Sequence, residues 1–252
     1  MPDATITAAD RHALAPGGAL RVAIAVGPAL SPMWTMRDAA TGKPRGVTVD
    51  LGAAMAAALG VSVDYVEHES SGKIVEAAAS GNWDVTFIPV DAERKKALAF
   101  GPNYFLGEST YLVAGRTGIK TLAGIDRPDI RITGVEGTAT IRSARRTIEQ
   151  ASVLGVTGLD EALALFAAGL SDAIALGRES LVELAGKFPG SRVLDGHFHA
   201  AGIAVGVPLA HDGALRAAST LLERFKADGR LRQMFDRNGL GHCDVAPAGS
   251  QS

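Results

Sequence analysis

The sequence is poor in cysteine, in charge of one sign and in long apolar runs, and each shortage excludes a class of protein. Cys243 is the single cysteine of 252 residues, so the chain cannot form an internal disulfide. The formal net charge is −2, and like charges form no long run, which argues against nucleic-acid or membrane-surface binding through bulk charge. The apolar fraction of 47% is enough for a substantial globular core.

A secretory leader is also missing from the N-terminal segment, MPDATITAADRHALAPGGALRVAIAV. No basic region is followed there by a continuous apolar stretch and a cleavage site of small residues. The run LRVAIAV is far too short to span a bilayer and is predicted to be a first strand. We expect either an intracellular protein or a mature form whose leader was removed, and Met1 favours the first.

Short apolar runs alternate with amphipathic stretches along the chain, a pattern typical of α/β proteins. Strands predicted at residues 20–26, 61–66 and 84–88 alternate with helices, which implies parallel pairing through right-handed crossovers. A second cycle of strands and helices begins with a strand at 130–135. The chain is therefore expected to hold two α/β units, each with its own core.

Some residues predict local details of these elements. Gly101–Phe105 is expected to be a turn, and a brief extended segment at Val47 is expected to lead into a helix. Ser70 lies in the predicted cap region of one helix, Glu179 begins another, and Gly229 is expected to break a pair of helices near the C-terminus.

Two further extended runs, Ser109–Ala114 and Gly202–Val207, are predicted between these units. If they lie side by side, the chain crosses to the second unit once and returns once. Two crossings make a hinge, and a small ligand would bind in a cleft between the lobes. The predicted domains are residues 1–112 plus 203–252 for the first lobe and 113–202 for the second.

Five segments of the chain resemble the family 3 extracellular solute-binding proteins, in the family's order. They read GVTVDLGAAMAAALG, AASGNWDVTFIPVDAERKKALAFGPNYF, GVEGTAT, LFAAGLSDAIAL and FKADGRLRQMFDRNG. The similarity covers the chain from about Leu20 to Gly241. It implies the two-lobed type II periplasmic-binding-protein fold with a two-strand hinge, and the role of a receptor for an amino-acid-type ABC importer.

The resemblance also implies a carboxylate clamp. Arg94 stands where amino-acid receptors place the arginine that grips the α-carboxylate, and Gly137, Thr138 and Ala139 match the segment that donates N–H groups from the second lobe. A guanidinium presents a planar pair of donors to a carboxylate, and a helix start adds a field that favours anions. The alternative for Arg94 is a solvated arginine beside two lysines.

The chain departs from the family pattern at two places. Ile88 is followed by Pro89, which has no N–H to offer a carboxylate. Gly177 stands where the family places the aspartate that pairs with the ligand's ammonium, and Arg178 follows it. A glycine cannot neutralise an ammonium, and an arginine repels it. We therefore expect a carboxylate without an α-amino group, or a dianion held by Arg94 and Arg178, in place of an ordinary amino acid.

Other candidate ligand contacts are less specific. Trp34 could stack on a flat or apolar ligand or could belong to the core. Ser71 lies at a predicted helix start facing the same side, and Lys73 nearby is either a third cation or a solvated lysine. Glu108, at the edge of the predicted hinge, could accept a ligand hydroxyl or ammonium, bind a donor on closure, or be solvated.

The function predicted from these residues is a non-catalytic, monomeric binding protein that closes on a small carboxylate-bearing or anionic solute, with an ABC permease as partner and no cofactor. His197 and His199 form an H-x-H pair without a third ligand, so no metal site is predicted. One alternative is an enzyme like prephenate dehydratases of this fold, with Glu108 as general acid. Another is a cytoplasmic solute sensor. The resemblance implies a periplasmic location, whereas the missing leader implies a cytoplasmic one.

Overall fold

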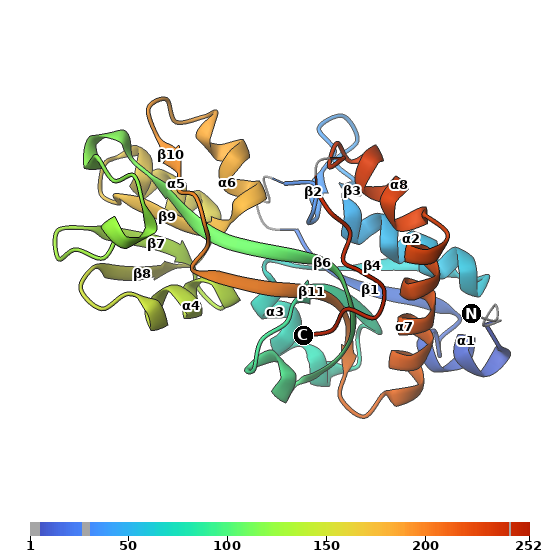
Figure 1. Ribbon diagram of the computed structural model, residues 1–252. Coiled ribbons are helices and arrows are strands. Elements are labelled where there is room, and N and C mark those ends of the chain that lie inside the picture. Colours follow the sequence, from blue (N-terminus) through green and yellow to red (C-terminus); the bar gives the residue numbers. More distant parts are fainter. Residues whose placement is uncertain (1–5, 27–30, 242) are drawn as a thin grey trace. The chain divides into compact units, whose positions relative to one another are not determined.

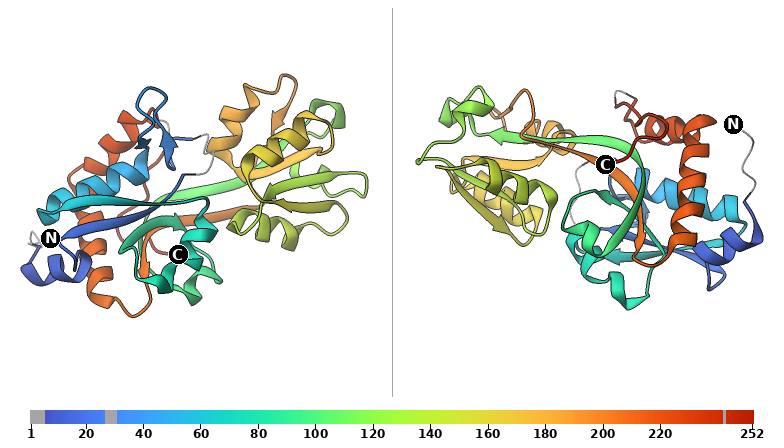
Figure 2. Two further views of the ribbon diagram at one scale, coloured as in Figure 1. Left: turned by 180° about the vertical axis from the view of Figure 1, so that it is seen from behind. Right: turned by 60° about the horizontal axis from the view of Figure 1, so that its bottom comes forward.

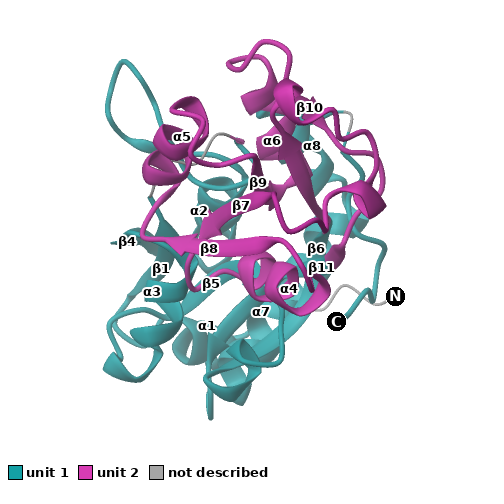
Figure 3. Cartoon of the chain, turned by 90° about the vertical axis from the view of Figure 1, so that its left-hand side faces the viewer, with its two compact units in different colours: residues 1–26, 32–106, 201–252 teal, residues 27–31, 107–200 magenta. Residues whose placement is uncertain are grey.

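The computed structural model describes the chain except residues 1–5, 27–30 and 242 (Figure 1). The described residues form two compact units (Figure 3). Unit 1 takes its residues from 1–26, 32–106 and 201–252, and unit 2 takes its residues from 27–31 and 107–200. The start of the loop after the first strand, at 27–30, and the first five residues of the N-terminal segment lie outside the described residues.

Unit 1 is an α/β unit built around the first three long strands of the sequence. Its sheet has the order β4-β1-β5-β11-β6, with β1 parallel to β4 and β5, and with β11 antiparallel to β5. Its elements are α1 (Ala8–Leu14), β1 (Ala19–Ala25), β2 (Met36–Arg37), β3 (Pro44–Arg45), α2 (Val47–Leu59), β4 (Ser62–His68), α3 (Ser71–Glu76), β5 (Val85–Pro89), the start of β6 (Leu98–Val113), most of β11 (His199–Pro208), α7 (Asp212–Ala227) and α8 (Arg230–Arg237).

The side chains of β1 alternate between the two faces of this sheet, as the period of a strand requires. Val22 and Ile24 pack into the larger core with residues of α2, α7 and α8. Ala23, between them, packs with Ile74 of α3 on the other face. Unit 1 is therefore a sheet with helices on both faces (Figure 2).

Unit 2 repeats this architecture at a smaller size. Its sheet has the order β6-β9-β7-β8, with β7 parallel to β8 and β9, and β9 antiparallel to β6. Ile132 and Ala144 share a core on the α4 face, and Ile174 and Leu181 share another core on the α6 face. Its elements are β7 (Arg131–Val135), α4 (Ala139–Thr147), β8 (Ser152–Val156), α5 (Leu159–Ala167), β9 (Ala173–Gly177), α6 (Arg178–Ala185) and β10 (Arg192–Val193), which pairs with β6.

Two strands carry the chain between the units. The boundary falls between Leu106 and Gly107 inside β6, and between Ala200 and Ala201 inside β11. These are the two extended runs that the sequence predicted, although both strands extend beyond them. Single turns of 3₁₀ helix complete the fold at Ala78–Ser80 (η1), Arg94–Lys96 (η2), Gly115–Thr117 (η3) and Leu122–Gly124 (η4).

Two local predictions from the sequence are wrong, and one strand is missing from them. The segment Gly101–Phe105, expected to be a turn, lies inside β6, where pairing with β11 overrides its turn-forming residues. The brief extended segment expected at Val47 is already the start of α2. The strand β8 (Ser152–Val156) was not predicted, because its pattern SVLGV includes a glycine and is half exposed.

Candidate functional site

The candidate residues of unit 1 centre on Arg94, which opens the 3₁₀ turn η2 after β5. Its side chain is only 2% exposed, and its guanidinium donates from Nη1 to the carbonyl of Pro89 (2.8 Å) and from Nη2 to Oγ of Ser71 (2.7 Å). Its Nε lies 3.6 Å from Oδ2 of Asp91. The guanidinium is therefore held by three different residues of unit 1.

The chain around Arg94 explains this placement. Asp91 accepts a hydrogen bond from the backbone N–H of Arg94 (2.9 Å) and so fixes the turn as well as balancing the charge. Pro89, which cannot donate an N–H, contributes its carbonyl instead. Ser71 is the first residue of α3, whose N-cap is Ser70, the cap region predicted from the sequence. Lys73 pairs with Glu76 across one turn of α3 (2.7 Å).

The other two unit 1 candidates contribute to the core. Ile88 is 3% exposed and packs under α3 with Ile74 and Trp83, so its side chain is structural. Trp34 is partly buried and packs against the larger core of unit 1. Its carbonyl also lies against Gly46, at the start of α2.

The candidate residues of unit 2 begin at the N-terminus of α4. Gly137 has a φ of 74°, which a glycine adopts readily, and this turn directs the chain into the helix. Thr138 is the N-cap: its Oγ1 accepts from the N–H of Ile141 (3.2 Å) and donates to the carbonyl of Val135 (2.8 Å). Ala139, the first helical residue, is 5% exposed.

Strand register brings Gly177 to the same part of unit 2. Gly177 ends β9 and is the register partner of Ser109 in β6. Oγ of Ser109 lies 2.9 Å from Oγ1 of Thr140, in the first turn of α4. Ser109 therefore pairs with Gly177, where the family's aspartate is absent, and also contacts the first turn of α4.

A carboxylate that the sequence reasoning missed lies over this glycine. Glu179, in the first turn of α6, places Oε2 3.6 Å from the position that a Cβ on Gly177 would occupy. The side chain of an acidic residue at 177 would extend from that point. The signal in the sequence was an acidic residue two positions after the glycine, at the start of a helix predicted to begin there.

Arg178, predicted to grip an anionic solute, is paired inside unit 2. Its Nε lies 3.0 Å from Oε2 of Glu108, and its guanidinium also donates to the carbonyls of Leu194 and Gly196. The other Glu108 oxygen, Oε1, lies 3.1 Å from Nδ1 of His197. Glu108 therefore balances Arg178 and is not simply solvated.

The two histidines of the H-x-H pair have different surroundings. His197 lies before β11 and contacts Glu108, whereas His199 is the first residue of that strand. Within the part of the chain that the structure describes, no three His, Cys, Asp or Glu side chains gather in a way that could hold a metal ion. In the same part, no helix is long and apolar enough to cross a membrane.

The fold and these residues define the class of protein. The family model for the bacterial extracellular solute-binding proteins, family 3, matches residues 22–240, and the chain belongs to this family. The family resemblance predicted from the sequence is thereby confirmed. Among the curated proteins, none matches the chain.

Solved structures confirm the type II periplasmic-binding-protein fold. The solute receptor for L-cysteine of Neisseria gonorrhoeae is 21% identical, with a TM-score of 0.82 over 94% of this chain and 99% of that one. The ancestral amino acid-binding protein AncCDT-1, a precursor of cyclohexadienyl dehydratase, is 22% identical, with a TM-score of 0.77 over 92% and 99%. AbpA of Streptococcus pneumoniae, bound to L-arginine, is 17% identical, with a TM-score of 0.77 over 92% and 99%. At these identities the likeness shows the fold alone.

Proposed function

We propose that the protein binds an amino acid and serves as the receptor of an ABC-type importer. The family supports a solute-binding role, and the similar structures include receptors whose names give cysteine and arginine as ligands. The observation that carries the choice of an amino acid over a dianion is the Glu179 carboxylate over Gly177. Glu179 supplies a negative charge beside Gly177, the position at which the family's aspartate is absent.

In this proposal the solute's two charges are bound by different units. Arg94 holds the α-carboxylate, with Ser71 and Asp91 keeping its guanidinium in place. The first turn of α4 adds N–H groups that a helix leaves without intrahelical partners. Glu179 pairs with the α-ammonium. A solute that contacts both units favours the closed form of the protein, which a permease then recognises.

Because an importer's receptor meets its solute outside the cytoplasm, we propose an extracytoplasmic location. Fractionation of cells that produce the native protein tests this point. Recovery with a periplasmic or surface marker is expected, and recovery with a cytoplasmic marker alone contradicts the importer role. It would favour the cytoplasmic sensor.

A thermal-shift panel of the twenty amino acids and matched carboxylates tests the ligand class. A ligand that binds the folded state stabilises it by RT ln(1 + [L]/Kd), about 2.7 kcal/mol at one hundred times Kd. At least one amino acid is expected to raise the melting temperature more than its deaminated analogue does. A panel in which only carboxylates without an amino group bind would contradict the role of Glu179.

Two conservative variants test the named residues with the amino acid so identified. Arg94→Lys keeps the charge but loses the planar pair of donors, and Glu179→Gln keeps the shape but loses the charge. We expect each to weaken binding about tenfold or more, by calorimetry. Glu183→Gln, on the same helix as Glu179, is the matched control and should bind as the parent does. Undiminished binding by both test variants refutes the assignment.

The dehydratase alternative has its own test in the same preparation. Glu108 is engaged by Arg178 and His197, whereas a general acid must present a proton to the leaving hydroxyl. Incubation with prephenate is expected to give no aromatic product in an ultraviolet assay. Turnover that is lost in Glu108→Gln would establish the enzyme and displace the receptor proposal.

A further inference from the structure

The two units contain the same arrangement of an arginine and an aspartate, at the N-terminal ends of their parallel strands. In unit 1, Asp84 accepts from Nε (3.1 Å), Nη2 (2.6 Å) and the backbone N–H (2.9 Å) of Arg21. In unit 2, Asp172 accepts from Nε (2.8 Å), Nη2 (3.1 Å) and the backbone N–H (3.0 Å) of Arg131. We call each of these pairs an Arg–Asp staple. The sequence carries the repeat as AASGNWD and FAAGLSD.

The glycine three residues before each aspartate has the same conformation and the same bond. Gly81 has a φ of 68° and Gly169 a φ of 70°. The carbonyl of Gly81 accepts from the guanidinium of Arg21, and that of Gly169 accepts from the guanidinium of Arg131. The two places are therefore close structural equivalents, and any difference between them is specific to one unit.

One difference is large: a second arginine covers the staple in unit 2. The Cζ of Arg116 lies 4.0 Å from the position of a Cβ on Gly169. Its Nη2 donates to Oδ1 of Asp172 (2.9 Å) and to the carbonyl of Ser171 (2.7 Å). Around Gly81, by contrast, no described atom lies within 4 Å of the corresponding position.

Strand pairing explains why unit 1 lacks this arginine. β6 pairs with β9 as β11 pairs with β5, so the residues after β11 correspond to those after β6. Counting along both registers, Ala114 corresponds to Pro208 and Arg116 to Ala210. Ala210 has a side chain of one carbon and a φ of 65°. At this position, therefore, unit 1 has no long side chain to place over its staple.

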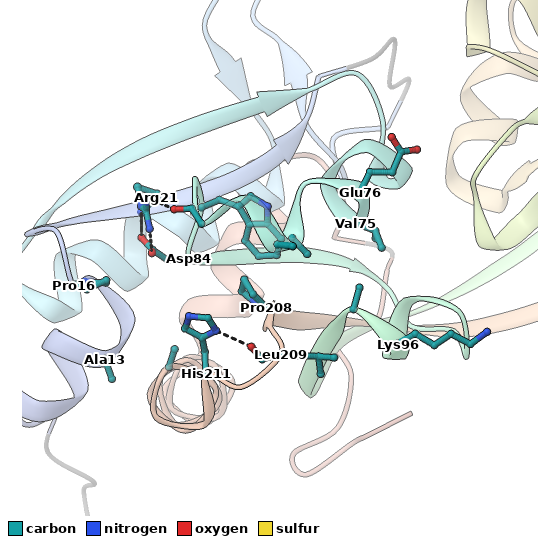
Figure 4. Close-up of a pocket in the computed structure, with 16 residues that line it drawn as sticks. Ala13, Pro16, Arg21, Val75, Glu76, Asp84, Lys96, Pro208, Leu209 and His211 are labelled. Atoms are coloured by element: carbon teal, nitrogen blue, oxygen red, sulfur yellow. Dashed lines mark hydrogen bonds and ion pairs between the residues drawn. The ribbon is translucent and has the colours of Figure 1, made fainter.

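A pocket of about 580 Å³ lies at this place in unit 1 (Figure 4). Figure 4 shows the staple of Arg21 and Asp84 on one side and the His211 ring on another. The Nδ1 of His211 lies 2.9 Å from the carbonyl of Leu209, which can only accept, so Nδ1 carries the proton and Nε2 of the neutral ring is an acceptor. The volume falls in the range of small-ligand sites.

The charged residues of the pocket lining are paired one to one inside unit 1. Glu76 pairs with Lys73, and Lys96 pairs with Glu93 through an ammonium that points away from the pocket in Figure 4. The staple of unit 2 is also a neutral pair, yet it takes a further guanidinium from Arg116. A neutral staple can therefore accept a second planar cation.

We infer that the unit 1 pocket binds the guanidinium group of a small molecule, in the place that Arg116 takes in unit 2. The carboxylate of Asp84 and the carbonyl of Trp83 correspond to the two acceptors that Arg116 uses. Nε2 of His211 offers a further acceptor on the lining. A fork of five N–H donors matches several acceptors at different angles, whereas an ammonium is a point charge. The site is separate from the proposed amino-acid contacts and does not depend on them.

Titration with methylguanidinium, followed by protein NMR, tests this inference at constant ionic strength. Saturable shifts are expected for amides around Gly81 and Asp84, with methylammonium binding at least fivefold more weakly. A blocked Gly-Arg-Gly peptide in the same titration distinguishes a free small molecule from an arginine side chain of a polypeptide. Shifts that never saturate, or equal binding of both cations, would overturn the guanidinium site.

Two variants with a matched control locate the site. His211→Lys places a fixed positive charge at the pocket, and Ala13→Phe fills it from α1. Each is expected to weaken methylguanidinium binding about fivefold or more. His12→Lys puts the same charge on α1 away from the lining and should bind as the parent does. If His211→Lys and Ala13→Phe both melt normally and bind undiminished, the pocket is not the site.

Discussion

The backbone of Gly46 lies against the carbonyl of the candidate residue Trp34, where a Cβ does not fit. Its φ is 127°, and a Cβ there would lie 1.9 Å from the Trp34 carbonyl oxygen and 3.0 Å from that of Pro32. Both neighbours are backbone atoms, so a flexible side chain cannot simply move away. Gly46 is also the N-cap position of α2.

We predict that Gly46→Ala lowers the free energy of unfolding by about 2 kcal/mol or more, because a strained φ and a backbone clash add. Urea unfolding followed by circular dichroism measures the change. Gly17→Ala is the control, since a Cβ at Gly17 meets nothing within 4 Å. Equal midpoints for the two variants would show that the loop moves aside freely.

A second prediction at the residue scale concerns how Asp172 affects the stability of the fold at low pH. The Arg131 guanidinium, which hydrogen-bonds the carboxylate, holds the pKa of Asp172 below its usual value. A lowered pKa in the folded state stabilises the protein fully above the unfolded-state pKa of about 3.9, and this stabilisation is lost as the pH falls from that value through the lower folded-state pKa.

Asp172→Asn is therefore expected to cost about 2 kcal/mol at pH 7 and to lose less stability than the parent between pH 4 and lower values. Urea midpoints at pH 7, 4 and 3 check both parts. Asp160→Asn, an exposed acid of α5, should follow the parent. An unchanged acid dependence in Asp172→Asn contradicts the role of this pair.

The sequence points to Arg94 but not to Glu179 as a candidate contact, because a motif identifies positions and not the directions of side chains. The arginine lies in the position that the family motif assigns, so counting from the motif finds it. Glu179 reaches back over Gly177 from the next turn of chain, and only the start of α6 sets that direction. The pairing of Arg178 with Glu108 joins residues seventy positions apart, which no local pattern reveals.

At the scale of elements, the C-terminal segment completes the crossing strands on the unit 1 side. The N–H of Asn103 in β6 donates to the Ser250 carbonyl (2.8 Å), and its Nδ2 donates to Oγ of Ser252 (2.9 Å). Asn103 is fully buried. A Cβ on Gly202 in β11 would clash with both Asn103 and Ser252. The segment thus packs on β6 and β11 together.

We predict that Asn103→Ala loosens this segment, because it removes the side-chain hydrogen bonds and leaves the backbone bond. The expected cost is about 1–3 kcal/mol, the usual penalty for a lost buried partner. Limited proteolysis should then cleave within residues 244–252 faster than in the parent. Asn82→Ala, on an exposed turn, is the control. Equal cleavage of both variants would contradict the predicted contact.

Elements with clear end signals were predicted well from the sequence. The break between α7 and α8 falls at Gly229, where φ is 80°, as the glycine indicated. β6 was predicted only over its last residues, because Gly101, Pro102 and Asn103 favour a turn when they are considered alone. Their extended form depends on β11 and on residues near 250, which are far away in the sequence.

At the scale of the whole molecule, the chain holds two α/β units. Both contain an Arg–Asp staple, and each has its own hydrophobic core. The larger core of unit 1 and the cores of unit 2 have no buried residue in common among the described residues. Each unit has its own Arg–Asp staple between the first strand of its parallel group and the strand paired with it. Among the described strands, β6 and β11 pass from one unit to the other.

This arrangement predicts that each staple stabilises its own unit. Asp84→Asn should raise amide exchange in β1 and β5, and Asp172→Asn should raise it in β7 and β9, because each removes charge-assisted bonds to one arginine. Hydrogen exchange with mass spectrometry, at a fixed neutral pH, resolves the two sets of peptides. The two variants serve as each other's controls. If either one accelerates exchange equally in both units, the chain opens as a single cooperative body, and the independence of the two cores is refuted.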